Sequence, residues 1–595
     1  MRNPTFTLCA IGLLASATPA QEHVAVWEGP AAGPGAIALY DPATGLPSGA
    51  PAELSAIWLL PFELAGRTDL TEFSPARARR FTDIAGASRV RLQSGVGSLY
   101  HFVRAGSGGS ASFGFLLVSR SAEPRILIER AGIGAGGGRN PFHSQIAVAP
   151  DGLAFLVATQ AAGGGDLLEI ETSGAFAIHE RTAAAGPARI FPWGLQLGAN
   201  FGVAVTNFGV LRFDRTTGAQ AALIGFGADA PPTYFSGILA ASNDTSHVVF
   251  AAGTSAQMQH VYSAGASGDA RRATQTAGPV MRAGTALDGH GGPWLAVSDD
   301  GVWCAWRTTG SSATGQVTHE CMVARAQNVP APAEQLSSDA RFLDTLDEVA
   351  LFAFRGPARL LFGVGEQNPG GLPGKLDLFS VDLQAGAVPQ FQNLTLTSGD
   401  ATVPFTAVPT LKPSRAVLLP DGSGIVLHDD SGSSGDMSVW RDGVPGLQTV
   451  LGQVKDLDTL DIRGPGALFA VRRDGGAREL YRGSSTFLGA PTLVTSTSSL
   501  TWFERPVARG DGWTGYIERD LNGERLARID TASGALDALL GGPALFGPAI
   551  GWSANGSLLF TRIQGSYHAH IAWPLAARPV RLLSNGSAGQ ILPAD

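Results

Sequence analysis

The chain has 595 residues, more than a single hydrophobic core usually supports, so we expect several domains or a repeat architecture. Hydrophobic residues make up 44% of the chain and charged residues 15%, a composition that excludes an intrinsically disordered protein. The formal net charge of −8 argues against a nucleic-acid-binding protein, because such proteins need a basic surface.

The first twenty residues resemble a secretory signal peptide. Arg2 provides the positive charge, residues 6–14 form an apolar stretch, and small residues allow cleavage after Ala20 or after Ala17. No later stretch approaches the run of about 20 apolar residues that a membrane-spanning helix needs. We therefore expect residues 21–595 to be exported to the periplasm or the outside of the cell, without insertion into a membrane.

Two strand-like runs follow this segment, at residues 23–27 and 36–41, and neither has a partner nearby in the sequence. We expect the last repeat of the chain, near Ile550, to accept one or both of them. Such pairing would remove an open sheet edge and join the two ends of the chain.

One pattern recurs along the rest of the chain: an apolar run, an Asp-Gly or Asn-Gly turn, a second apolar run and, after a polar loop, a third. The turn glycines provide the positive φ that tight hairpins need. Clear copies occupy residues 146–174, 294–307, 416–440, 506–534 and 550–573, and less regular copies begin near Arg89, Leu195, Ile238, Val349 and Leu460. These ten copies recur about every 40–65 residues, which is typical of four-stranded units.

The clearest turns are Ala149-Pro150-Asp151-Gly152 and Leu419-Pro420-Asp421-Gly422. They resemble the Ser-Pro-Asp-Gly turns of the TolB-like and WD-repeat-like β-propeller repeats of exported bacterial proteins. The resemblance implies an all-β fold, a β-propeller of about ten four-stranded blades, arranged as one large ring or as two tandem propellers that divide near residues 397–414. It implies an architecture and no activity.

Two cysteines, Cys304 and Cys321, remain once the segment that contains Cys9 is removed. Each lies in a strand-like run, and the Gly/Ser/Thr-rich stretch at residues 308–316 predicts a hairpin that places them opposite each other. We expect a disulfide between them, because an exported chain folds in an oxidising compartment. The alternative is a pair of reduced, buried cysteines.

The segment Gly289-His290-Gly291-Gly292-Pro293 resembles the oxyanion segment of prolyl-oligopeptidase-type peptidases. A peptidase of that kind also needs a Gly-x-Ser-x-Gly turn, which this sequence lacks. We therefore interpret the segment as a glycine-rich loop between repeats.

Two further groups contain residue types that bind metals. His568 and His570 alternate along a strand and share one face, but the sequence identifies no third ligand. Asp456, Asp458 and Asp461, like the stretch at residues 429–436, lack the spacing of a known calcium loop. We favour a partly exposed strand face for the histidines and solvated loops for the aspartates.

The leading hypothesis is therefore an exported binding or scaffold protein, monomeric, that presents loops to a protein or glycan partner. We expect no catalytic, cofactor-binding or metal-binding residues, and no nucleic-acid partner. One alternative is a glycan-active hydrolase or lyase whose active residues come from several repeats. Another is a structural cell-surface protein. We attribute the near absence of lysine, only Lys375, Lys412 and Lys455, to base composition.

Overall fold

The computed structural model describes residues 23–592 with gaps, of which the longest are 80–88, 182–189, 281–294, 337–347 and 394–411. The described residues are almost entirely β-strand, with a single 3-10 turn at Ala52–Leu54 and no α-helix. The expectation of an all-β chain is confirmed. Within the described part of the chain, no helix is long and apolar enough to cross a membrane.

Ten sheets contain these strands. The sheet that joins both ends of the chain contains β1 (Val24–Gly29), β2 (Ala36–Tyr40), β3 (Pro47–Gly49) and β47 (Ala588–Leu592). The second sheet contains β4 (Ile57–Leu60), β8 (Arg89–Arg91), β9 (Ser98–Ala105), β10 (Ala111–Val118) and β11 (Arg125–Ala131). The third sheet contains β5 (Glu63–Leu64), β12 (Phe142–Val148), β13 (Ala154–Thr159), β14 (Leu167–Glu171) and β15 (Ile178–Glu180).

Four sheets of four consecutive strands follow. They are β16 (Ile190–Leu197), β17 (Phe201–Thr206), β18 (Gly209–Asp214) and β19 (Ala222–Leu223); β20 (Tyr234–Ala241), β21 (Val248–Gly253), β22 (Gln259–Ala264) and β23 (Arg271–Arg272); β24 (Leu295–Val297), β25 (Trp303–Ser311), β26 (Val317–Arg325) and β27 (Glu334–Gln335); and β28 (Glu348–Arg355), β29 (Arg359–Gln367), β30 (Pro373–Asp382) and β31 (Gln390–Asn393).

The remaining strands form one nine-stranded and two four-stranded sheets. The large sheet contains β6 (Thr71–Ser74), β7 (Arg77–Arg79), β32 (Lys412–Leu418), β33 (Gly424–Asp429), β34 (Gly435–Trp440), β35 (Gln448–Arg463), β36 (Gly466–Arg473), β37 (Arg478–Ser484) and β38 (Thr492–Thr497). The last two are β39 (Trp502–Ala508), β40 (Trp513–Asp520), β41 (Gly523–Asp530) and β42 (Leu536–Leu539), and β43 (Leu545–Trp552), β44 (Ser557–Gln564), β45 (Tyr567–Pro574) and β46 (Arg581–Gly586).

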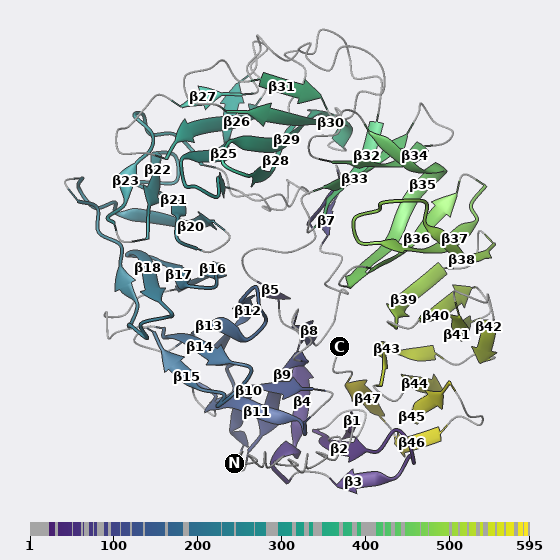
Figure 1. The fold of residues 1–595 in the computed structure, drawn as a ribbon. Coiled ribbons are helices and arrows are strands. Elements are labelled where there is room, and N and C mark those ends of the chain that lie inside the picture. The colour runs from purple at the N-terminus through teal and green to yellow at the C-terminus, as the bar shows by residue number, and fades with distance from the viewer. Residues whose placement is uncertain are drawn as a thin grey trace, which may run out of the picture.

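The sheets follow one another around the middle of the molecule in a propeller-like arrangement (Figure 1). Adjacent sheets pack face to face: Leu156 and Ala158 of β13 share a core with Leu211 and Phe213 of β18 in the next sheet. Central strands are therefore covered on both sides, and every residue of β13 is buried. This explains why these strands appear in the sequence as continuous apolar runs and not as alternating ones.

The 16-residue strand β35 connects two groups of strands in the nine-stranded sheet. Its first part pairs with β34, from Gln448 to Val454, and its second part pairs with β36, as far as Arg463. Asp456, Asp458 and Asp461 lie in this strand, so the expected loop at these residues is wrong.

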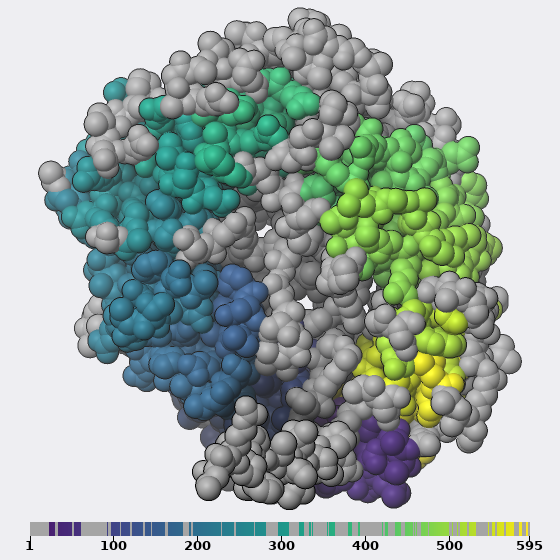
Figure 2. Space-filling model, in the orientation of Figure 1, coloured from purple at the N-terminus to yellow at the C-terminus, as the bar shows by residue number. Residues whose placement is uncertain are grey.

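The ends of the chain meet in one sheet, where β1 pairs antiparallel with β47 and places Val26 opposite Ile591. Both predicted N-terminal strands are present, but they pair with β47 and with each other, not with strands of the last repeat. They pack instead against that repeat, because Val26 shares a core with Leu559 and Ala572. Figure 2 shows the purple and yellow ends of the chain side by side.

Several predicted features lie outside the described residues. These are the signal peptide at residues 1–20, the segment at residues 289–294 and most of the possible domain boundary at 397–414. On either side of that boundary, β30 and β32 contact each other.

Candidate functional site

The structure corrects the predicted disulfide. The hairpin is present as β25 and β26, but its register pairs Cys304 with Ala324 and Cys321 with Arg307. The two cysteines are thus three positions out of register, and because side chains alternate along a strand they lie on opposite faces of the sheet. Both are free, fully buried thiols in different cores, and burial raises the pKa of the Cys304 thiol to about 12.

The two histidines of β45 have different environments. His568 is partly exposed, whereas His570 is buried, with Nδ1 3.0 Å from Oγ1 of Thr561. Burial lowers the pKa of His570 to about 4, so the ring is neutral near pH 7. The Thr561 hydroxyl also accepts a hydrogen bond from the Ile591 amide of β47, at 3.2 Å. His570 therefore belongs to the seam where the last sheet meets the C-terminal strand.

Of the three predicted aspartates, Asp458 has a described side-chain partner. Asp458 forms an ion pair with Arg478 of β37, with Oδ2 2.9 Å from Nε. In the described part of the chain, no group of three or more His, Cys, Asp or Glu side chains lies close enough to hold a metal ion.

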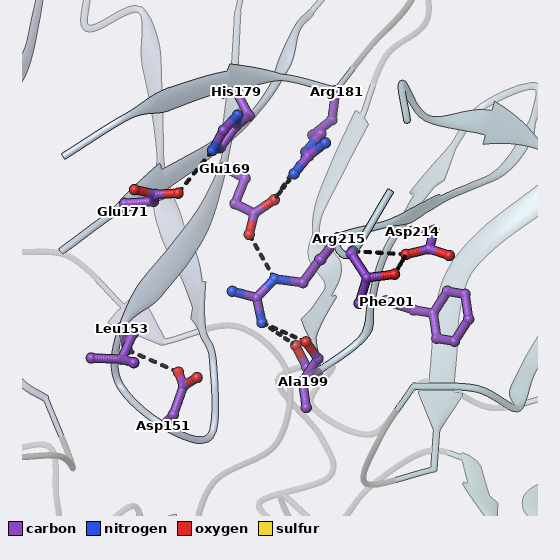
Figure 3. Close-up of polar contacts among 12 residues, drawn as sticks. Asp151, Leu153, Glu169, Glu171, His179, Arg181, Ala199, Phe201, Asp214 and Arg215 are labelled. Atoms are coloured by element: carbon purple, nitrogen blue, oxygen red, sulfur yellow. Dashed lines mark hydrogen bonds and ion pairs between the residues drawn. The ribbon is translucent and has the colours of Figure 1, made fainter. Parts of the chain in front are cut away.

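An ionic cluster that the sequence analysis missed lies between two neighbouring sheets (Figure 3). Glu169 lies in β14 on the face that carries the buried Leu167, and its side chain is only 4% exposed. Arg181, just beyond β15, donates from Nε and Nη2 to Oε2 of Glu169, at 2.9 and 2.6 Å. Arg215, just beyond β18 of the next sheet, donates from Nε to Oε1 at 2.6 Å. Both carboxylate oxygens are thus held by guanidinium groups.

The same arginines also bind backbone carbonyls. Arg215 donates from Nη1 to the carbonyls of Gly198 and Ala199, at 2.6 and 3.1 Å, and Arg181 donates to Ala219 at 3.2 Å. Beside them, a hydrogen bond from His179 lowers the pKa of Glu171. Two of these contacts, from Arg215 to Glu169 and from Arg181 to Ala219, join the third sheet to the fourth, so this cluster clamps the two sheets together. The signal in the sequence is the acidic residue inside the apolar run of β14.

Arginine has a comparable role elsewhere. Arg528 of β41 is fully buried and donates from Nη1 to the carbonyls of Trp573 and Pro574 in the next sheet, at 2.9 and 2.8 Å. Its guanidinium lies 3.8 Å from the ring centroid of Trp573. Arg441, just beyond β34, donates to the carbonyl of Phe487, beyond β37 of the same nine-stranded sheet, at 2.7 Å. A planar, five-donor guanidinium suits such sites better than lysine does.

A neighbouring sheet covers the turn between the first and second strands of β24–β27: Gly301 has φ 69°, and a Cβ there would overlap the ring of His247 from the preceding sheet. Turns between the second and third strands lie at the opposite end, and there Phe208 is 58% and Met258 51% exposed. Because β16–β19 and β20–β23 have the same strand order, these two turns are equivalent positions of adjacent sheets.

No protein-family model and no curated protein matches this sequence. A solved structure of a prolyl endopeptidase is similar to this chain at 12% sequence identity and a TM-score of 0.30, over 70% of this chain. The match spans about half, 53%, of that neighbour.

Proposed function

We propose that this chain is an exported propeller-type scaffold that binds a protein partner through the end of the sheets that carries the turns between second and third strands. The observation that supports it is the exposure of Phe208 and Met258 at equivalent turns of adjacent sheets. Large apolar side chains that stay exposed on a folded chain can act as anchors at protein contact sites.

The proposal includes a closed ring of TolB-like or WD-repeat-like blades. Dividing the nine-stranded sheet within β35 yields one group of four strands, β35–β38, and another of four, β32–β35, to which β6 and β7 are added, so the ten sheets would correspond to eleven blades. Ten of them coincide with the ten sequence repeats, and the eleventh combines the two ends of the chain. Pairing of β1 with β47 would then close the ring, and one continuous ring is favoured over two tandem propellers because β30 and β32 are in contact.

The test compares cross-linked partners of tagged chains in the exporting cell. Phe208→Asp combined with Met258→Asp is the test variant, and Leu488→Asp is the control, because Leu488 is a 66% exposed residue of a different loop. We expect one cross-linked protein with the native chain and with the control, reduced about tenfold or more in the test variant, because each change removes an apolar anchor. The same set of cross-linked species for all three chains would refute the proposed binding end.

A separate experiment tests whether the chain is exported and its first residues are removed. Removal of residues 2–20 should retain the chain in the cytoplasm, and N-terminal sequencing of the exported chain should begin at Gln21 or at Thr18. An exported chain that still begins with the unprocessed N-terminus would contradict the signal-peptide interpretation.

A further inference from the structure

Short strands from the N-terminal part of the chain lie in the middle of the molecule, inside the surrounding sheets (Figure 1). β5 pairs in parallel with β12, with Leu64 opposite Ile146. β6 pairs antiparallel with β32, with Glu72 opposite Val417, and β7 completes a hairpin with β6. The chain then returns to its own sheet, where β8 pairs with β9.

These pairings connect sheets that are far apart in the sequence. β5 and β6 are only six residues apart, yet β12 and β32 are separated by more than 260 residues. The seven peptide units from Leu64 to Thr71 reach about 25 Å at most when extended, which limits the distance between the facing ends of β5 and β6. Together β5, β6 and β7 link the inner edges of two separate sheets.

In these contacts an extended segment is added as a further strand at the edge of an existing sheet. A strand at a sheet edge presents a row of unpaired backbone N–H and C=O groups, which readily accept another extended segment. The edge of β32 receives Thr71, Glu72 and Phe73 in this way, opposite Leu418, Val417 and Ala416. Backbone hydrogen bonds provide the affinity in this mode of recognition, so it selects for extended peptides as a class.

We infer that the inner edge of β32 is a strand-accepting site, that the β6–β7 hairpin is its intramolecular occupant, and that an extended peptide binds there when the hairpin is removed. The site lies in the middle of the molecule and is separate from Phe208 and Met258, so it does not depend on the proposed binding end.

The first experiment tests the pairing in the full chain. Residues directly opposite each other in an antiparallel pair have Cβ atoms about 4.5–5.5 Å apart, close enough for a disulfide to form with a small adjustment. In a Cys9→Ser background, Glu72→Cys with Val417→Cys should cross-link under mild oxidation, whereas Glu72→Cys with Thr497→Cys should not. Thr497 lies in β38, at the other edge of the same sheet, and both native cysteines beyond Cys9 are buried. Absence of the first cross-link, or equal formation of both, would overturn the inference.

The second experiment tests whether the edge of β32 binds a peptide once the β6–β7 hairpin is removed. Residues 69–81 are replaced by a Gly/Ser linker of equal length, and a fluorescent peptide of sequence 69–81 is titrated against the variant. We expect binding to the variant at least about tenfold tighter than to the full chain, because in the full chain the hairpin occupies the edge. A peptide with proline in place of Glu72 and Phe73 should not bind, because proline cannot donate to the ladder.

A folded variant that does not bind the peptide would overturn the proposed site. If the variant does not fold, the cross-linking experiment decides the inference on its own. Combining Phe208→Asp with the linker variant should leave peptide binding unchanged, which distinguishes this site from the proposed binding end.

Discussion

Glu169 is the acidic side chain on which the clamp between the third and fourth sheets depends, because Arg181 and Arg215 both donate to it inside the molecule. Replacing Glu169 by Gln leaves the buried Arg181 and the half-buried Arg215 without their anion, and loss of one partner of a buried ion pair typically destabilises a fold by about 3–5 kcal/mol. We expect a clear fall in the urea midpoint of unfolding. The control is Glu180→Gln, whose ion pair with Arg130 is exposed and is worth less than about 1 kcal/mol. Equal shifts for the two variants would contradict a structural role for the buried cluster.

The lowered pKa of His570 predicts that the folded chain loses stability in acid. Its pKa in the folded chain is about 4, below the ordinary value of 6.5, so the unfolded chain binds the proton more tightly. Its contribution to the free energy of unfolding is therefore fully present above pH 6.5 and is lost progressively as the pH falls towards 4. At about 1.4 kcal/mol per pKa unit, the loss approaches roughly 3 kcal/mol.

The measurement compares unfolding at pH 7 and pH 4.5 in the native chain, His570→Gln and the control His568→Gln. The groups beside His570 are the hydroxyl of Thr561, the side chain of Ser584 and the ring of His568, whose charge further lowers its pKa. We expect a flatter pH dependence for His570→Gln alone. Identical pH profiles for all three chains would show that His570 does not contribute.

At the scale of elements, neighbouring sheets are joined by two kinds of contact. Arginines near the ends of strands donate to carbonyls of an adjacent sheet, as Arg528 does to Trp573. At two first-to-second-strand turns, a side chain from one sheet covers the turn glycine of the next: His247 covers Gly301 and Arg509 covers Gly556. The scarcity of lysine, attributed above to base composition, thus coincides with a structural use of arginine.

Two turn glycines allow the stability cost of backbone strain to be measured separately from the cost of steric overlap. Gly301 and Gly218 have nearly equal φ, 69° and 70°, but a Cβ at Gly218 would meet open space, whereas at Gly301 it would meet His247. We expect Gly218→Ala to cost about 1–2 kcal/mol from the left-handed backbone alone. Gly301→Ala should lower the urea midpoint further, and Gly301→Ala with His247→Ala should recover part of the difference. A Gly301→Ala effect no larger than that of Gly218→Ala would exclude tight packing of this turn.

At the scale of the whole molecule, the two ends of the chain stabilise each other. Ile591 and Leu592 of β47 are buried in two different cores, one shared with the last sheet and one shared with β9 and β10. A chain that ends at Gly586 loses both side chains, worth about 3–6 kcal/mol together, and leaves the edge of β1 unpaired. We expect a lower melting temperature and aggregation measured by light scattering. A chain that ends at Leu592 is the control, and equal behaviour of the two would contradict the pairing of the termini.

Much of the fold was predictable from local chemistry. Apolar runs rich in Val, Ile, Leu and Phe indicated strands, and Asp-Gly turns indicated hairpins, because these preferences depend on residues next to each other in the chain. Gly152 and Gly301 have the positive φ that the turn pattern implies, and strands begin close to the expected repeat starts. By itself the sequence therefore determined the all-β class and the positions of many of its turns.

Only the tertiary structure decided which groups meet. The register of β25 and β26 separates Cys304 from Cys321, β35 continues where a loop was expected, and β1 pairs with β47 instead of a strand of the last repeat. The partners of Glu169, and the strands added to β12 and β32, likewise come from distant parts of the chain. The physical reason is that a strand carries the same unpaired backbone groups whatever its partner. Its register and neighbours are therefore selected by packing between sheets, which no local pattern contains.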